Sequence, residues 1–188
     1  GASFYSYGIQ ILGESSFKIQ YDNTFDDKDA STYLASTGSL SNTVLCNFYQ
    51  NSTLGIYTAY NNRNLELLGN NFTDIGSVEI RVFGNPSQKG EIGPQQGDPG
   101  EAAGNCFENP VSAIVANPTS SLPFDYYVHN LDNNPVFCQK PTNNLSDGGT
   151  NNYKLEPAAG PRSDCGNQEP PRDVTENDLF AARETTAA

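Results

Sequence analysis

Residues 46–82, CNFYQNSTLGIYTAYNNRNLELLGNNFTDIGSVEIRV, decide the predicted fold. This stretch consists of short apolar runs separated by turns that are rich in Asn and Gly. Side chains alternate between two faces over residues 44–49 and 78–82, and residues 56–60 combine β-branched and aromatic side chains. Such alternation is typical of antiparallel strands with one buried and one solvated face. The stretch therefore predicts an all-β fold.

The flanking sequence extends this pattern in both directions. Residues 3–12 and 17–21 alternate on either side of Gly13-Glu14 and predict a hairpin, and residues 32–36 predict a further short strand. Three later strand candidates, which we expect to complete the same sheet system, are residues 111–116, 124–128 and 135–138. Together these strands predict an antiparallel β-sandwich, or Greek-key domain, over residues 1–138.

Two segments are expected to lie outside the strands. Residues 84–104 are rich in Gly and Pro, but their Gly spacing of three and four excludes a collagen helix and predicts a long loop. Residues 139–188 predict a Pro-rich, mostly irregular tail with a possible short helix over residues 176–184. Leu179 and Phe180 are the large apolar residues of that helix and are candidates for docking on a partner molecule.

The net charge of −12 limits the classes of partner. A strongly acidic surface repels the phosphates of nucleic acid and the headgroups of anionic membranes. No stretch approaches the roughly 20 apolar residues of a membrane span. We therefore expect no nucleic-acid partner and no membrane insertion, whereas a cationic partner or a divalent cation remains compatible with the charge.

The cysteines and glycosylation sequons indicate an extracellular, secreted protein. The four cysteines form no C-x-x-C pair, which favours two disulfides over a zinc site: Cys46, Cys106, Cys138 and Cys165. Four cysteines allow three pairings, of which we favour Cys46 with Cys106 and Cys138 with Cys165. Three N-x-[ST] sequons predict N-glycosylation: Asn51, Asn71 and Asn144.

Part of the central stretch resembles a βγ-crystallin Greek-key motif. The residues that carry this resemblance are Phe48, Gly55, Thr73, Asp74 and Ser77. The resemblance covers about forty residues and implies a folded first hairpin, pinned by an acidic turn that binds calcium in many members of the family. However, Thr73 replaces the expected Asn or Asp, and Val78 replaces a second Ser. We therefore do not transfer the calcium site to this chain.

The sequence contains no recognisable catalytic centre. His129 is the single histidine and no G-x-S-x-G motif is present, so a catalytic triad has no support. Two carboxylates could still hydrolyse a glycosidic bond, but no spacing selects a pair among the candidates Glu66, Glu79, Asp74 and Asp125. The Asp27-x-Asp29-x-Ser31 loop lacks the Gly and Glu of an EF-hand and predicts a solvated loop. We expect no bound metal, no cofactor and no enzymatic role.

Tyrosines are the remaining candidates for a binding surface, because a tyrosine ring combines an apolar face with a polar edge. Those in strand candidates are Tyr5, Tyr7, Tyr49, Tyr57, Tyr60, Tyr126 and Tyr127. Our first hypothesis is a secreted, glycosylated structural or interaction module, such as a matrix, cell-surface or filament subunit, that contacts copies of itself or other extracellular proteins. The alternatives are a carbohydrate- or calcium-binding β module and, more remotely, a glycosidase.

Overall fold

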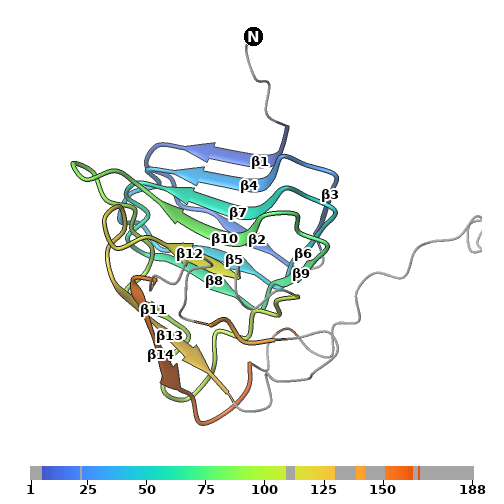
Figure 1. Cartoon of the computed structure of the whole chain (residues 1–188), viewed down its shortest axis with the longest axis vertical. Helices are drawn as coiled ribbons and strands as arrows, with labels where there is room; N and C mark the ends of the chain where they lie inside the picture. The colour runs from blue at the N-terminus through green and yellow to red at the C-terminus, as the bar shows by residue number, and fades with distance from the viewer. Residues whose placement is uncertain are drawn as a thin grey trace, which may run out of the picture.

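The chain forms a β-solenoid with parallel sheets (Figure 1). The computed structural model describes residues 6–21, 23–108, 113–129, 139–142, 151–162 and 165. The all-β class is confirmed, but the predicted antiparallel β-sandwich, or Greek-key domain, is wrong, because every pairing between the named strands is parallel. Alternation of side chains reports which strands have two different faces. It does not report the direction in which neighbouring strands run.

Three sheets form the walls of the solenoid, and each of about three successive turns contributes one strand to each wall. Sheet A contains, in spatial order, β1 (Tyr7–Leu12), β4 (Ala30–Ala35), β7 (Leu54–Ala59), β10 (Val78–Phe83) and β12 (Ile114–Ala116). Sheet B contains β2 (Lys18–Gln20), β5 (Asn42–Leu45) and β8 (Leu65–Leu68). Sheet C contains β3 (Thr24–Asp26), β6 (Phe48–Gln50) and β9 (Asn71–Thr73). In Figure 1, sheet B lies behind sheet A, and sheet C closes one side.

A fourth sheet packs below the solenoid in Figure 1. It consists of β11 (Gln95–Gln96), β13 (Phe124–Val128) and β14 (Tyr153–Pro157). The first of these strands lies in the 84–104 segment, and the last lies in the tail that we expected to be irregular. The expected helix over residues 176–184, with Leu179 and Phe180, lies outside the described residues. No helix within the described ranges is long and apolar enough to cross a membrane.

Each corner of the first three turns contains a residue with positive φ. The residues are Gly13 (81°), Ser36 (55°) and Tyr60 (61°) after sheet A, Tyr21 (60°), Cys46 (58°) and Gly69 (61°) after sheet B, and Asp27 (53°), Asn51 (49°) and Asp74 (52°) after sheet C. A left-handed residue turns the chain sharply without a long loop, and Gly, Asn and Asp tolerate this conformation best. The predicted hairpin of residues 3–12 and 17–21 is therefore wrong, because the corner sends β1 and β2 into different sheets.

The interior holds a ladder of buried asparagine side chains. Asn47 donates from Nδ2 to Oδ1 of Asn70 at 3.2 Å, and Asn70 donates to Oδ1 of Asn105 at 3.0 Å. Asn23 begins the ladder by donating to Asn47 at 2.8 Å, and Asn105 ends it by donating to the hydroxyl of Tyr126 at 3.0 Å. A buried amide must be hydrogen-bonded to be tolerated, and this ladder satisfies amides of successive turns through one another.

A stack of aromatic rings runs beside the asparagine ladder. Phe25, Tyr49, Phe72 and Phe107 stack in order, with centroids 5.0, 5.0 and 5.4 Å apart. A Cβ on Gly55 would lie 2.7 Å from Cε1 of Phe72, so the strand opposite the ring requires glycine there. These rings make the solenoid interior a packed core rather than a channel.

One disulfide ties the later chain to the solenoid. Cys46 is bonded to Cys165 across a sequence separation of 119, with a Cα–Cα distance of 5.4 Å. The favoured pairings of Cys46 with Cys106 and of Cys138 with Cys165 are therefore both wrong, because Cys46 and Cys165 are bonded to each other. Cys106 forms a β-bridge with Asn71 beside sheet C, whereas Cys46 occupies the corner after sheet B. Cys106 is also disulfide-bonded, and Cys138 lies outside the described residues.

Candidate binding cleft on sheet B

The outer face of sheet B carries two rows of side chains that cross the three stacked strands. Ile19, Val44 and Leu67 point into the core, with exposures of 6%, 0% and 1%. Their neighbours along the strands must face outward because alternate strand residues point to opposite faces. The register aligns Lys18 with Thr43 and Glu66 in one row, and Gln20 with Leu45 and Leu68 in the other.

These two rows form the floor of a cleft of about 610 Å³. The residues that line it are Lys18, Gln20, Tyr21, Thr43, Leu45, Glu66, Leu68, Gln95, Gly97, Asp98 and Arg162. Its size lies within the range of small-molecule sites, which combine an apolar floor with a few polar groups that fix orientation. Leu45 and Leu68 supply the apolar floor, and Tyr21, which is 49% exposed, adds an aromatic ring.

One wall is held against sheet B by the buried side chain of Gln96. Its Oε1 accepts from the backbone N–H of Leu67 at 2.7 Å, and its Nε2 donates to the carbonyls of Leu65 at 3.0 Å and Gly93 at 3.1 Å. The amide thus hydrogen-bonds the outer edge of β8 as a further strand would. This fixes the adjacent residue, Gln95, at the side of the cleft.

The second wall includes Arg162, whose side chain is only 9% exposed. Its Nε donates to the carbonyl of Ala102 at 3.0 Å, and its Nη2 lies 3.4 Å from a carboxylate oxygen of Glu101. The Cys46–Cys165 disulfide anchors the chain just beyond Arg162. We call residues 158–162 together with Cys165 the latch, because these residues hold the wall against the solenoid.

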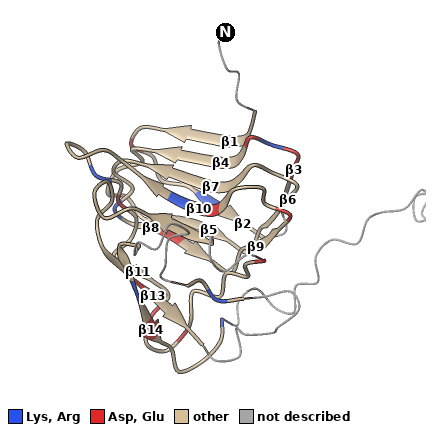
Figure 2. Ribbon diagram, viewed as in Figure 1, with Lys and Arg blue, Asp and Glu red and all other residues tan. Residues whose placement is uncertain are grey.

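Charge in the cleft is nearly balanced. Lys18 and Arg162 are cationic, and Glu66 and Asp98 are anionic, whereas the whole chain carries −12. Asp98 is held in a tight turn, where its Oδ1 accepts from the N–H groups of Gly100 at 2.6 Å and Glu101 at 3.0 Å. Elsewhere, acidic residues are visible at the corner beside β3, β6 and β9 (Figure 2). The cleft therefore favours a neutral polar ligand over a polyanion.

A second hollow continues the cleft along sheet B. It measures about 330 Å³ and shares Glu66 and Gln95 with the larger cleft. Its other lining residues are Ser41, Asn64, Gly93 and Pro94. Glu66 thus lies where the two hollows meet, which gives the site an elongated form suited to an extended ligand.

The four carboxylates predicted as glycosidase candidates do not form one site. Glu66 lines the cleft, whereas Glu79 is 2% exposed in β10. Asp74 occupies a corner after sheet C, and Asp125 belongs to β13. Asp98, which does line the cleft with Glu66, was missed because the 84–104 segment was interpreted only as a loop.

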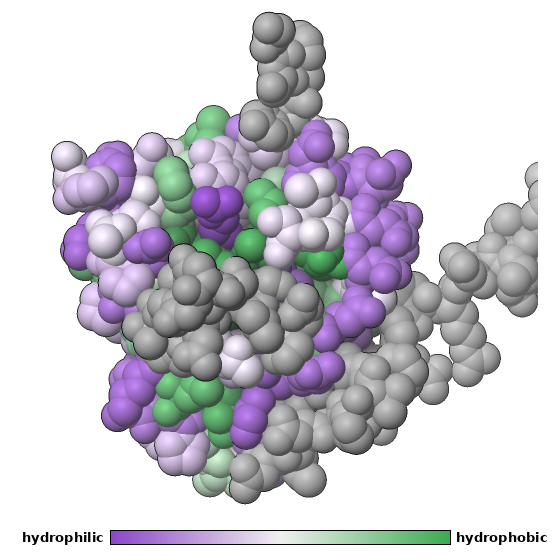
Figure 3. Space-filling model, viewed as in Figure 1, coloured by the Kyte–Doolittle hydropathy of each residue, from purple (hydrophilic) through white to green (hydrophobic). Residues whose placement is uncertain are grey.

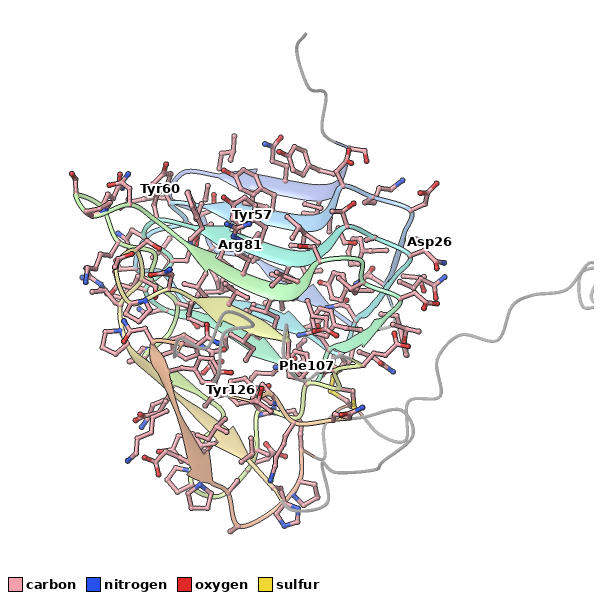
Figure 4. The ribbon with its side chains drawn as sticks, in the orientation of Figure 1. Asp26, Tyr57, Tyr60, Arg81, Phe107 and Tyr126 are labelled. Atoms are coloured by element: carbon pink, nitrogen blue, oxygen red, sulfur yellow. A yellow bond between two sulfur atoms is a disulfide. The ribbon has the colours of Figure 1, made fainter. Side chains whose placement is uncertain are left out.

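Some of the candidate tyrosines lie in the core, and others lie on the outer surface of sheet A. Tyr49 and Tyr126 are buried, and burial raises the pKa of Tyr49 despite the opposing hydrogen bond with Thr32. Tyr127 is 8% exposed, and Tyr5 lies outside the described residues. Three of the tyrosines predicted as surface candidates lie along sheet A: Tyr7, Tyr57 and Tyr60. Figure 4 shows Tyr57 beside Arg81 and Tyr60 farther along, at the corner that follows β7. Figure 3 shows hydrophobic residues on this face and a hydrophilic edge beside sheet C.

The predicted glycosylation sites Asn51 and Asn71, and the Asp27-x-Asp29-x-Ser31 loop that was predicted to be solvated, do not line the cleft. Asn51 is exposed at a corner, and its Nδ2 donates to Oδ1 of Asp26 at 3.0 Å. Asn71 is partly exposed in β9, and Asn144 lies outside the described residues. Oδ2 of Asp29 accepts from both the N–H and the hydroxyl of Ser6, at 2.6 and 3.0 Å. Within the described ranges, no cluster of three or more His, Cys, Asp or Glu could hold a metal ion.

Comparison with known proteins identified no matching family model, no similar curated protein and no similar solved structure.

Proposed function

We propose that this protein is an extracellular, non-catalytic module that binds a neutral oligosaccharide chain in the sheet B cleft. The observation that carries the proposal is the alignment of Lys18, Thr43 and Glu66 across three stacked strands, at the floor of one elongated hollow. A ligand with hydroxyl groups along its length can hydrogen-bond with successive turns of the solenoid. The four cysteines and three sequons support the extracellular setting.

The polarity of the cleft matches the chemistry of a sugar chain. Carboxylate, amide and hydroxyl groups donate to or accept from sugar hydroxyls, and the half-exposed ring of Tyr21 can pack against the apolar face of a sugar ring. The side chain of Gln96 holds the neighbouring Gln95 beside the cleft, and the carboxylate of Asp98 already accepts from the N–H of Gly100, so binding orders few additional groups. A balanced cleft on a chain of −12 charge selects against acidic polysaccharides.

A glycan array followed by calorimetry tests this function. The wild-type protein should bind neutral oligosaccharides and ignore acidic ones. Glu66→Gln should weaken binding roughly tenfold or more, since a hydrogen bond to a charged group contributes about 1.5–3 kcal/mol. Gln10→Ala, an exposed change on the opposite sheet, is the matched control and should bind as the wild type does. Binding that is equal in both variants would contradict the proposal.

Self-association is a second candidate, favoured by one feature of the solenoid. Among the described strands, β1, β2 and β3 each form the end of their sheet, so three parallel edges face the same way. Exposed strand edges can pair with another chain, and Leu12 on β1 is 59% exposed. A second copy meeting this end would make the protein an assembly subunit. Light scattering should then show a concentration-dependent dimer that Leu12→Lys abolishes; a monomer at all concentrations would exclude it.

A further inference from the structure

Three tyrosine rings contact one another across neighbouring turns on the outer face of sheet A. Tyr33 and Tyr57 are register partners in β4 and β7, and their ring centroids lie 5.2 Å apart. Tyr7 stacks on the other side of Tyr33 at 5.3 Å, with an interplanar angle of 22°. All three rings are partly exposed. We call Tyr7, Tyr33 and Tyr57 the tyrosine ladder.

The parallel register holds Tyr33 and Tyr57 at the spacing of the strands. Tyr7 is the register partner of Ala30, so its ring reaches Tyr33 diagonally across β1 and β4. Beyond Tyr57 the ladder ends in side chains that are not phenols. The guanidinium of Arg81 lies 5.8 Å from the centroid of Tyr57, and the ring of Phe83 meets Tyr57 edge-on at 5.8 Å (Figure 4). Tyr33 is therefore the member of the ladder whose ring contacts both of the other phenols.

The arrangement suits chemistry between the rings better than contact with a sugar. One face of Tyr33 is stacked against Tyr7, and Tyr57 contacts Tyr33 at an interplanar angle of 40°, so these two neighbours restrict the access of a ligand to the faces of the Tyr33 ring. Partial burial, together with the phenols of Tyr7 and Tyr60, raises the pKa of Tyr33. A tyrosine phenol is protonated at neutral pH, so Tyr33 loses a proton together with an electron when it is oxidised.

We propose that the tyrosine ladder is a site of oxidative modification, at which Tyr33 forms an intramolecular dityrosine bond with Tyr7 or Tyr57. The oxidant is hydrogen peroxide, used through a peroxidase-type catalyst. Each phenol loses one electron and one proton to give a phenoxyl radical. The two radicals couple by a carbon–carbon bond between positions ortho to the oxygens, and tautomerisation restores both aromatic rings. One hydrogen peroxide is reduced to two waters, and the protein loses two hydrogen atoms for each link.

Other tyrosine contacts among the described residues lack this combination of proximity and access. Tyr49 is buried between Phe25 and Phe72, neither of which forms a phenoxyl radical. Tyr126 and Tyr153 lie 6.3 Å apart at 59°, and they are only 2% and 4% exposed. The link should therefore form selectively on sheet A. This inference does not depend on carbohydrate binding at sheet B.

The test treats dilute, folded wild-type protein with a haem peroxidase and limiting hydrogen peroxide. The expected product is a monomer that has dityrosine fluorescence and lacks two hydrogen atoms per link. Peptide mapping should then find Tyr33 joined to Tyr7 or Tyr57. Tyr33→Phe should reduce the monomer signal to background. Tyr21→Phe removes a tyrosine that is 49% exposed elsewhere, and this matched control should leave the yield unchanged.

Two further outcomes would overturn the inference. One is crosslinking confined to dimers and larger species, which would mean that the rings react only between molecules. The other is an undiminished monomer signal in Tyr33→Phe, which would place the link elsewhere. Circular dichroism of each variant before oxidation establishes that the solenoid is intact. Unfolding the wild type in urea before oxidation should abolish selectivity for the ladder, because the register no longer holds the rings together.

Discussion

Asn70 donates from Nδ2 to Oδ1 of Asn105 at 3.0 Å, although 35 residues separate them in sequence. The same Nδ2 donates to the carbonyl of Val44 at 2.9 Å, and Oδ1 of Asn70 accepts from the N–H of Asn47 at 3.2 Å. One buried amide therefore connects three turns of the solenoid. The asparagine ladder, together with the aromatic stack beside it, fixes the register in which the turns pile up.

Replacing Asn70 by Ala should therefore be strongly destabilising. The change removes several hydrogen bonds and leaves buried backbone and amide groups without partners, at a cost of about 1–3 kcal/mol for each unsatisfied group. Urea denaturation should show a loss of at least about 2 kcal/mol in the free energy of unfolding. Asn23→Ala, at the exposed end of the ladder, is the control and should cost less than about 1 kcal/mol. Equal losses would show that the ladder is not cooperative.

Gly69 should not tolerate a side chain. It adopts φ +61°, and a Cβ there would lie 1.9 Å from Sγ of Cys165. Gly69→Ala should lower stability by more than the roughly 1–2 kcal/mol of left-handed backbone strain, because the latch must also move. Gly76→Ala is a matched control, since the nearest atom to its Cβ would be 3.8 Å away. Thermal unfolding of both variants should show a clear shift for Gly69→Ala alone; similar shifts would mean that the latch does not pack there.

Gln96 should contribute more to stability than an ordinary surface glutamine. Gln96→Leu keeps the side chain large but removes the groups that bond Leu67, Leu65 and Gly93. We expect a loss of about 2–4 kcal/mol, because buried backbone groups at the edge of β8 become unsatisfied. Gln88→Leu, on an exposed turn, is the control and should change stability by less than about 0.5 kcal/mol. Hydrogen exchange at the N–H of Leu67 should accelerate in Gln96→Leu; unchanged protection there would contradict the role assigned to the side chain.

Stability should decline at high pH because of buried tyrosines. Burial raises the pKa of Tyr49 above its ordinary value of 10.0, and burial also raises that of Tyr153. Above about pH 10 the unfolded phenols lose their protons while the folded ones keep them, so the free energy of unfolding falls by about 1.4 kcal/mol per pH unit for each such group. Below about pH 10, the buried phenols contribute their full stabilisation to the folded state. In urea titrations between pH 8 and 11, the free energy of unfolding of Tyr49→Phe should fall less steeply with pH than that of the wild type. Parallel curves for the two proteins would refute Tyr49 as an origin of the decline.

The positions of many strands could be predicted from the sequence, but their pairing could not. Alternation identified the strands within residues 3–12 and at 78–82, and β-branched and aromatic content identified the strand around residues 56–60. The alternation over residues 44–49 instead spans the corner at Cys46, which separates β5 from β6. Parallel pairing joins residues about 24 positions apart, and no local turn signal reports it. A missed signal was available: the pattern N-x-[FY]-x-[DN] begins at Asn23, Asn47, Asn70 and Asn105. Those positions supply the asparagine ladder, the aromatic stack and several corners, so a search for repeats would have indicated a solenoid.

The cleft was less accessible to prediction than the strands. Glu66 was one of four candidate carboxylates, but its partners Lys18 and Thr43 become neighbours only through the register of sheet B. Tyr21 was assigned to a predicted hairpin and was not recognised as a surface ring. Asp98 lay in a segment rich in Gly and Pro, where composition says nothing of which side chains face a site. A binding site that is built from side chains of stacked turns can be predicted only after the sequence repeat that aligns those turns has been recognised.

The central claim is that sheet B binds a neutral oligosaccharide, and backbone amide chemical shifts measured during a titration test it most directly. The probe is the neutral oligosaccharide that binds best on the array, with an acidic oligosaccharide of equal length as the control. Binding at sheet B should produce shifts concentrated at residues 18–21, 43–45, 66–68 and 95–98, and these shifts should saturate with the neutral probe alone. Shifts centred on sheet A, or no shifts with any neutral oligosaccharide, would contradict it.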